Sequence, residues 1–266
     1  MPDSFRQMHR PGDPFILANA WDAGSAKMLV ALGAQAIATS SAAHAFTLGR
    51  PDMGTLTRDE ALAHAQDLVA AVNVPVSGDF ENGFGEAPDT CAETVRLAAE
   101  AGLAGICIED TALPDDAPYA VQLAADRIRA AASAARALPR DFMLVARADG
   151  LLTGHYDESE ATRRIQAFEA AGADAVYVPG PPSMEALGRL VKATSLPFNA
   201  LVAGPYAQYA RSDFAALGVA RLSLGSALAR ATWRTIHDAG QAMFTEGRFD
   251  PLQDALPFAT VNPMLT

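Results

Sequence analysis

Eight short apolar segments with the composition of β-strands alternate with Ala-rich, amphipathic segments along this 266-residue chain. The apolar segments cover residues 15–20, 36–39, 74–78, 105–108, 142–146, 175–178, 196–199 and 220–224. Continuous apolar strands separated by helices are typical of a parallel sheet that helices cover on both faces. Because there are eight such units, the pattern favours a closed barrel over an open sheet, and it predicts an α/β fold of the (β/α)₈ TIM type.

The length agrees with a single domain, because barrels of about 250 residues commonly fold as one unit. We therefore expect residues 1–266 to form one (β/α)₈-barrel domain. Residues 240–266 follow the last predicted helix and contain three prolines and Phe258. Their apolar content predicts a C-terminal extension that packs on something, such as another subunit.

The balance of charges argues against nucleic acid as a partner. With 31 acidic and 20 basic residues the chain has a formal charge of −11, so its overall field repels polyanions. An anionic substrate would need cations supplied locally.

The apolar stretches are too short to span a bilayer, and residues 1–14 show no secretory pattern. The two cysteines, Cys91 and Cys107, have no partner motif, so we expect packing residues and a cytoplasmic protein.

Carboxylates follow two neighbouring strands at the points where the strands end. Asp79 and Glu81 lie two residues apart at the end of the third strand, and Glu109 ends the fourth. Residues i and i+2 of a strand project to the same side, so Asp79 and Glu81 are expected to share a face that Glu109 also reaches. Three carboxylates at one place repel each other unless they bind protons or a cation, and Mg²⁺ prefers such oxygen ligands. The alternative is that these acids cap helices or pair with arginines on the rim of the barrel.

Other strand ends offer groups for an anionic substrate. Arg147 ends the fifth strand, where its guanidinium can hold a carboxylate with two parallel hydrogen bonds. An internal ion pair with Asp149 or Glu109 explains the same residue equally well. Ser40 and Ser41 follow the second strand, and their hydroxyls and backbone N–H groups could cradle an oxyanion, although small residues also simply allow close packing.

The first strand ends at Trp21. Its ring could flank a planar oxo acid, or it could serve only in packing.

Taken together, these strand ends resemble the isocitrate lyase/phosphoenolpyruvate mutase superfamily over residues 15–233. The resemblance is specific in the order and spacing of six motifs, which are Asn-Ala-Trp-Asp at 19–22, Ser-Ser-Ala at 40–42, Gly-Arg-Pro-Asp at 49–52, Asp-Phe-Glu-Asn-Gly-Phe-Gly at 79–85, Ile-Glu-Asp at 108–110 and Ala-Arg-Ala-Asp at 146–149. It implies a Mg²⁺ cofactor, with Mn²⁺ as an alternative. Asp79 would contact the metal directly, and Glu81 and Glu109 would hold its waters.

The resemblance also implies roles for the remaining site residues. The substrate, a small 2-oxo or 2-hydroxy carboxylate, would be bound by Trp21, Ser40, Ser41, Ala42, Arg147 and Asn199. Asp52, on a mobile loop near the site, would act in catalysis together with Glu109 and Arg147. Members of the superfamily are usually homotetramers that exchange the eighth helix, so the resemblance implies a homo-oligomer, a dimer of dimers.

Three departures from the family pattern bear on the reaction. The family usually has two aspartates where this chain has Asp79 and Glu81. Residues 111–118, after Glu109 and Asp110, contain no Cys, Lys or His, whereas the isocitrate and methylisocitrate lyases carry their catalytic thiol there and the mutases carry a lysine and an asparagine. The sixth strand runs into Pro179 and Gly180, where lyases tend to place a glutamate and mutases a histidine.

The sequence therefore predicts a Mg²⁺-dependent carbon–carbon lyase that acts on a small 2-oxo or 2-hydroxy di- or tricarboxylic acid through a metal-stabilised enolate. Oxaloacetate decarboxylase and isocitrate or methylisocitrate lyase are the models for this reaction. One alternative is a phosphonopyruvate or phosphoenolpyruvate mutase or hydrolase. Another is a non-catalytic protein that binds 2-oxo acids.

Overall fold

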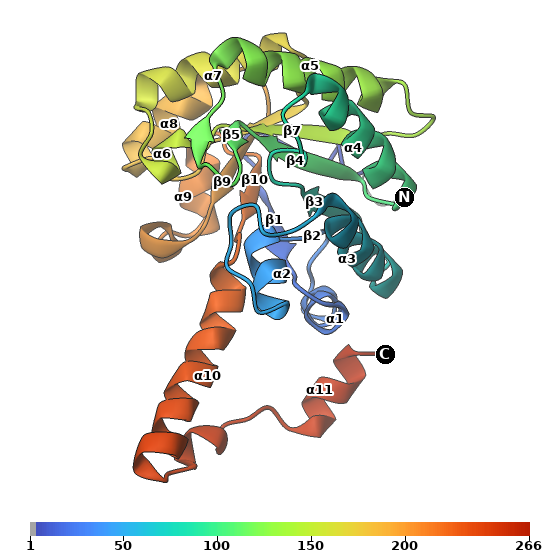
Figure 1. Ribbon diagram of the computed structural model, residues 1–266. Coiled ribbons are helices and arrows are strands. Elements are labelled where there is room, and N and C mark those ends of the chain that lie inside the picture. Colours follow the sequence, from blue (N-terminus) through green and yellow to red (C-terminus); the bar gives the residue numbers. More distant parts are fainter. Residues whose placement is uncertain (1–3) are drawn as a thin grey trace.

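The computed structural model describes residues 4–266, in which eight parallel strands close into a barrel. In chain order these strands are β1 (Phe15–Asn19), β2 (Ile37–Ala38), β3 (Val76–Asp79), β4 (Gly105–Glu109), β7 (Met143–Arg147), β8 (Ala175–Tyr177), β9 (Phe198–Leu201) and β10 (Arg221–Ser223). The ring closes because β1 pairs with both β2 and β10. The predicted (β/α)₈ TIM-type barrel is thus confirmed, and each strand overlaps its predicted range (Figure 1).

Helices follow every strand of the barrel, and most of them form an outer layer around it. They are α1 (Ala23–Ala31), α2 (Ser41–Thr47), α3 (Arg58–Ala71), α4 (Pro88–Glu100), α5 (Val121–Arg136), α6 (Gly150–Thr153), α7 (Glu158–Ala170), α8 (Met184–Lys192), α9 (Arg211–Ala216), α10 (Ala227–Glu246) and α11 (Phe258–Met264), with short 3₁₀ turns η1 (Gly204–Gln208) and η2 (Asp250–Leu252). Local sequence fixes where several begin: Thr57 and Glu60 cap α3 reciprocally, and Asp22 and Ser25 do the same for α1. The strand ends that precede these helices are thereby held in place.

The apolar core has two parts. The larger part lies between the sheet and the helices and includes Phe80, Ile106 and Phe168. A smaller part fills the amino-terminal end of the barrel interior, where Phe5 and Phe15 pack with Met143 and others. The carboxyl-terminal end of the interior is lined instead by polar side chains, and this is the end at which barrel enzymes place their chemistry.

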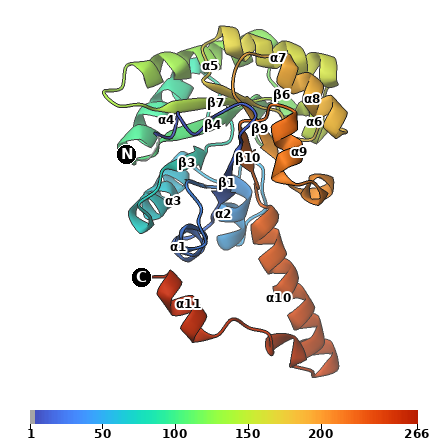
Figure 2. The same ribbon diagram turned by 180° about the vertical axis from the view of Figure 1, so that it is seen from behind.

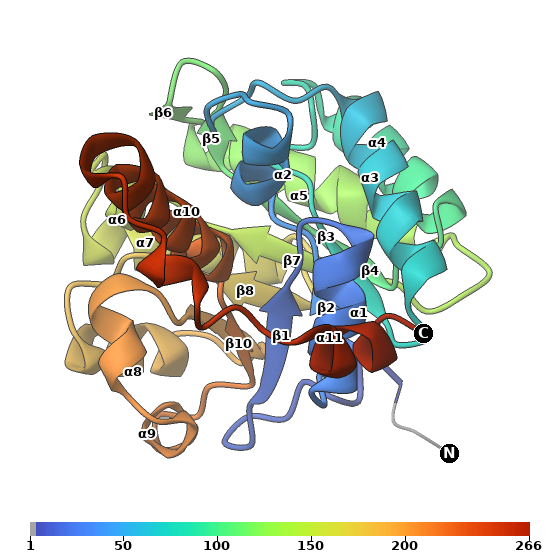
Figure 3. The ribbon, with the colours of Figure 1, turned by 90° about the horizontal axis from the view of Figure 1, so that it is seen from below.

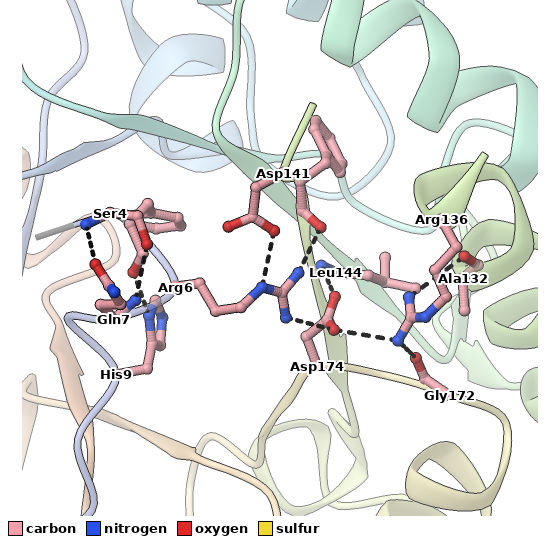
Figure 4. Close-up of polar contacts among 12 residues, drawn as sticks. Ser4, Arg6, Gln7, His9, Ala132, Arg136, Asp141, Leu144, Gly172 and Asp174 are labelled. Carbon is pink, nitrogen blue, oxygen red and sulfur yellow. Dashed lines mark hydrogen bonds and ion pairs between the residues drawn. The ribbon is translucent and has the colours of Figure 1, made fainter. Parts of the chain in front are cut away.

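The segment before β1 lies across the amino-terminal end of the barrel. Arg6 donates to Asp141 over 2.8 Å, to Asp174 over 2.7 Å and to the carbonyl of Phe142 over 3.1 Å (Figure 4). Asp174 also accepts from Arg136 on α5. These contacts hold the segment in place, and the His9 ring lies edge-on to the rings of Phe5 and Phe15 beneath the barrel interior.

The last barrel helix does not cover the barrel. Helix α10 points away from the strands, and the chain then turns back so that α11 lies near α1 (Figures 1 and 2). The predicted C-terminal extension is therefore present, although its boundary differs, because the helix continues past residue 240 to Glu246. In the view from below, α10 and α11 lie apart from each other in front of the barrel, and the segment that joins them crosses near β1 (Figure 3).

A small hairpin stands beside the barrel mouth. It consists of β5 (Thr111–Ala112) paired antiparallel with β6 (Ala117–Pro118), and it is formed by residues 111–118. Within residues 4–266, no helix is both long and apolar enough to span a bilayer.

Candidate active site

Asp79, the last residue of β3, is held by α2. Its Oδ2 atom accepts hydrogen bonds from both the backbone N and the Oγ of Ser41, each over 2.9 Å. Its own backbone N–H donates to Thr39 Oγ1 over 2.7 Å. The second carboxylate oxygen, Oδ1, faces the barrel interior, 3.5 Å from the Cys107 thiol and 3.7 Å from the Arg147 guanidinium. Asp79 is therefore fixed in orientation, with one oxygen presented to the site.

Glu81 reaches the site by a different route from the one expected. Strand β3 ends at Asp79, so alternation along a strand does not place the two carboxylates on one face. Instead Glu81 lies in a turn with a φ of 45° and accepts a hydrogen bond from the Gly54 N–H over 3.2 Å. Burial, together with the negative charge of Asp79, raises the pKa of Glu81 from 4.5 to about 7. The carboxylates of Asp79 and Glu81 are thus close enough to repel each other, and a cation bound between them would relieve this repulsion.

Glu109 ends β4 and its side chain is 7% exposed. Burial raises its pKa, an effect that Arg147 opposes and that Asp149 and Asp79 reinforce. Asp52 comes from the loop after α2, next to Met53, whose φ is 73°. Burial raises the pKa of Asp52 as well, and Asp79 adds to the rise. Four carboxylates thus come from three strand-end loops to one region.

The donor set suits a hard cation. Within residues 4–266, no group of three or more His, Cys, Asp or Glu side chains is arranged so that it could hold a metal ion by itself. Mg²⁺ does not require one, because it usually keeps several waters and takes only one or two protein carboxylates. One oriented carboxylate, Asp79, with Glu81 and Glu109 nearby and raised in pKa, fits a cation that is bound largely through water.

Arg147 ends β7 and already has three acidic partners. It forms an ion pair with Asp149, and its Nη1 atom lies 3.3 Å from Glu109 Oε2 and 3.7 Å from Asp79 Oδ1. Its guanidinium also lies over the Tyr177 ring, 5.3 Å from the centroid. The internal ion pairs that the sequence offered as an alternative are therefore present, and a substrate carboxylate would have to share Arg147 with them.

A diagonal row of polar side chains crosses the barrel interior. In register on neighbouring strands lie, in order, Glu109, Arg147, Tyr177, Asn199 and Arg221. Residues in register project to the same face, and the tilt of barrel strands carries such a row from one end of the barrel toward the other. It begins at the last residue of β4 and ends at the first of β10. Most barrels fill this space with Val, Ile and Leu, so the row marks the interior as a polar site.

The other predicted substrate residues lie around the same mouth, each also held by its own contacts. Ser40 caps α2 through Ala43, and Ala42 is buried in that helix. The backbone carbonyl of Trp21 is 2.9 Å from His64 Nε2. Asn199 is buried and donates to Ser223 Oγ over 2.8 Å. Asn199 was expected at the end of its strand, but β9 continues to Leu201, so Asn199 lies deeper in the barrel than expected.

Two separate cavities lie in this part of the molecule. An outer cavity of 810 Å³ is lined by Glu81, Asn82, Leu113 and Tyr119, among others. An inner cavity of 50 Å³ lies within the barrel and is lined by Asp79, Arg147, Asn199, Arg221 and other residues of β1 to β10. The hairpin β5–β6 contributes to the outer cavity only.

Three residues of the inner cavity were missed by the sequence reasoning. Cys107 was expected to be a packing residue, but it lines this cavity and donates to Asp79. Burial, with Asp79, raises the pKa of its thiol, so it is protonated. Tyr177 and Arg221 are the others. The available signal was strand alternation, which places Cys107 on the same face as Glu109.

Comparisons with known proteins show which families this chain is similar to. The family model described as phosphoenolpyruvate phosphomutase matches residues 5–244. A 2,3-dimethylmalate lyase from Eubacterium barkeri is 36% identical over 66% of this chain and 62% of its own length. An oxaloacetate decarboxylase from Paraburkholderia xenovorans is 30% identical over 89% of this chain and 80% of its own.

Two solved structures are also similar. A Burkholderia cenocepacia protein, provisionally classed as a lyase or mutase, is 44% identical, with a TM-score of 0.93 over 98% of this chain and 93% of that chain. A phosphonopyruvate hydrolase solved with oxalate and Mg²⁺ is 26% identical, with a TM-score of 0.85 over 98% and 93% of the two chains.

Proposed function

This chain belongs to the phosphoenolpyruvate mutase/isocitrate lyase superfamily and is a lyase, and from this premise we propose that it cleaves a carbon–carbon bond in a small 2-oxo or 2-hydroxy di- or tricarboxylic acid with the help of Mg²⁺. One observation supports this most directly. Asp79 is fixed by two hydrogen bonds from Ser41 and presents its other oxygen to a cavity bounded by Arg147. A neighbouring superfamily structure that contains oxalate and Mg²⁺ supports the choice of cation.

Asp79 would hold the cation directly, and Glu81 and Glu109 would hold its waters. A cation held in this way would supply positive charge for the oxo oxygen of the substrate. Arg147 orients a carboxylate of the substrate, and Glu109 and Asp149 fix the guanidinium in the direction of the cavity. In this proposal Ser40, Ser41 and Ala42 would form one wall of the substrate site and Trp21 another, and Asp52 would act from the loop after α2.

The phosphorus reaction is the second candidate, because the matching family model describes a phosphomutase. A lysine and an asparagine of the mutases are absent from the hairpin residues 111–118. Because the thiol of the isocitrate-type lyases is absent there too, the hairpin does not decide between the two reactions. The similarity to a 2,3-dimethylmalate lyase and an oxaloacetate decarboxylase supports carbon–carbon cleavage.

¹H NMR of the purified protein with Mg²⁺ and a panel of 2-oxo and 2-hydroxy acids tests the proposal. We expect new product signals from at least one dicarboxylic acid and none when Mg²⁺ is chelated. Conversion of phosphonopyruvate, seen by ³¹P NMR, without conversion of any carboxylic acid would replace the lyase proposal with the phosphorus reaction. Binding without turnover of either class would contradict both.

We also propose that the protein is a homo-oligomer that exchanges α10. On the outer face of β1, where an eighth helix would normally lie, there is instead a groove of 350 Å³ lined by Ile16, Leu29, Leu32 and Leu224, among others. Helix α10 itself exposes large apolar side chains: Trp233 is 50% exposed, Ile236 65% and Phe244 89%. A patch of this kind marks an interaction surface, and the groove and α10 of a second copy are complementary in character.

A further inference from the structure

Arg221 differs in its partners from Arg147 and Arg164, which both form ion pairs with acids. It is the first residue of β10, is 4% exposed and faces the inner cavity. Its Nε donates to Asn199 Oδ1 over 2.8 Å, and its Nη1 lies 3.4 Å from His9 Nε2. Among residues 4–266, no carboxylate forms an ion pair with Arg221.

His9 does not offset this charge. Its ring is buried against Phe5 and Phe15, its Nδ1 lies 2.8 Å from the Phe5 carbonyl, and Arg6 anchors the segment that holds it (Figure 4). Burial and the charge of Arg221 lower the pKa of His9 to about 3, so the ring is neutral. Arg221 therefore keeps a full positive charge in the interior of the barrel, where an unpaired charge is costly.

The inner cavity therefore contains two arginines in different electrostatic states. Arg147 is surrounded by Asp149, Glu109 and Asp79, so its charge is largely offset. Arg221 has no acid as an ion-pair partner in the described part of the chain. The inner cavity, which both arginines line, has a volume of 50 Å³. It has room for about three or four waters, or for one carboxylate group of a ligand whose other end lies nearer the barrel mouth.

We propose that Arg221 is a specificity-determining residue. The second carboxylate of the substrate neutralises its positive charge, so that the site selects dianionic over monoanionic oxo acids. This rests on the proposed function only in taking a 2-oxo acid as the ligand. Arg147, shared among three acids, orients the first carboxylate. Asn199 positions Arg221 through the hydrogen bond to its Nε, and Ser223 in turn holds Asn199.

The test compares two ligands that differ only at the second carboxylate. 2-Oxoglutarate is a dianion, and 2-oxovalerate has the same five-carbon chain with a methyl group in place of that carboxylate. Dissociation constants for both are measured by calorimetry at fixed free Mg²⁺. For Arg221→Met we expect the affinity for 2-oxoglutarate to fall by about tenfold or more, while the affinity for 2-oxovalerate changes less than about threefold.

Arg140→Met is the matched control, because Arg140 binds backbone carbonyls such as that of Ala99 away from the cavity. It should change neither constant. Melting temperature gives a second measurement: Arg221→Met should melt at or above the wild-type temperature without ligand, since it removes an unpaired buried charge, whereas a merely structural arginine would lower it.

Equal losses for both ligands, or no loss for either, would overturn the proposal. If Arg221→Met does not fold, Arg221→Gln gives the same comparison while keeping a donor for Asn199, and misfolding of both variants would assign Arg221 to the core and also overturn it. An Arg221-dependent preference for the dianion without turnover of any acid would leave this inference standing while contradicting the proposed lyase. Turnover of a carboxylic acid, together with an unchanged preference for the dianion in Arg221→Met, would support the proposed lyase and contradict this inference.

Discussion

The Nη1 atom of Arg147 lies 3.3 Å from Oε2 of Glu109. The residue expected to bind the substrate carboxylate is thus already paired with an acid at the end of the neighbouring strand. The pair is buried, and Asp149 completes it on the other side. Arg147 is consequently both a structural cation and a candidate ligand-binding group, and substitutions can separate the two roles.

Arg147→Lys keeps the charge but loses the planar fork that serves several acceptors at once. We expect the affinity for 2-oxo diacids to fall by roughly 10- to 100-fold, with the barrel still folded. Arg147→Met, which leaves buried acids without a partner, should lower the free energy of unfolding by about 3–5 kcal/mol. Calorimetry and denaturant unfolding measure the two effects, with Arg189→Lys at an exposed ion pair as control. Wild-type affinity in Arg147→Lys would restrict Arg147 to the structural role.

The raised pKa of Glu81 predicts opposite effects of pH on stability and on metal binding. Its folded pKa of about 7 lies above the ordinary 4.5, so the metal-free folded protein retains a proton that the unfolded chain has lost. This contribution to stability is present below pH 4.5 and is lost as the pH rises through 7. The affinity for Mg²⁺ should change in the other sense, weakening by roughly tenfold per pH unit below 7, because the cation must displace that proton.

Thermal melts and Mg²⁺ titrations between pH 5 and 8 measure both trends. Glu81→Gln should reduce both slopes, leaving the part due to Glu109, and Glu86→Gln on the exposed loop beyond it should leave both unchanged. Identical slopes in the wild type and Glu81→Gln would remove Glu81 from the metal site.

Much of the fold could be predicted from the sequence because it depends on local patterns. Continuous apolar strands, such as 105–108, are buried on both faces in the barrel and alternate with amphipathic helices. The number and order of the strands could therefore be predicted. The direction of α10 could not be predicted, because an amphipathic helix has the same sequence pattern whether it packs on its own barrel or on that of another subunit. Its exposed Ile236 and Phe244 become informative only once the groove beside Ile16 is seen.

The site was predictable at the strand ends and not beneath them. Asp79, Glu109 and Arg147 end their strands, and the rule that barrel loops meet at one face brings them together. Glu81 arrives through a turn with positive φ, which strand alternation does not anticipate. Arg221 lies at the opposite end of its strand, and its proximity to Arg147 depends on the stagger of four strands around the barrel.

Asp79→Ala should abolish Mg²⁺-dependent binding of 2-oxo acids and leave the barrel folded, because the Asp79 carboxylate contacts the polar groups of Ser41, Cys107 and Arg147 at the site and is not part of the apolar core. Mg²⁺ titration and circular dichroism give the two measurements. Asp67→Ala, at an exposed position of α3, serves as the control. Retained Mg²⁺ affinity in Asp79→Ala would contradict its assignment as the direct ligand.

The exchange of α10 predicts an oligomer that depends on the apolar face of that helix. Wild-type protein should elute as a dimer or tetramer in light-scattering chromatography, and Ile236→Glu combined with Phe244→Asp should shift it toward the monomer. Leu152→Glu, a substitution of a 52% exposed leucine on α6, is the control and should not change the mass. A monomeric wild-type protein would rule out the exchange.

The last prediction follows from the hairpin that replaces the lid. Cleavage of isocitrate leaves a carbanion beside a carboxylate, a very basic fragment that an acid must protonate in place. Residues 111–118 provide no thiol, lysine or histidine for this step. Decarboxylation of oxaloacetate instead leaves the enolate of a ketone, which water can protonate after release. We therefore expect turnover of oxaloacetate, or of a close analogue, to be much faster than that of isocitrate or methylisocitrate.

A coupled pyruvate assay and a glyoxylate assay, run at equal enzyme and Mg²⁺ concentrations, make this comparison. 2-Oxoglutarate has no carboxylate β to its oxo group and should act as a competitive inhibitor rather than a substrate. Arg221→Met should weaken this inhibition, since the inhibitor has two carboxylates. Efficient release of glyoxylate from isocitrate would contradict the prediction. The acid would then have to come from elsewhere, such as Asp115 or Asp116 of the hairpin or the protonated thiol of Cys107, which lines the inner cavity beside Asp79.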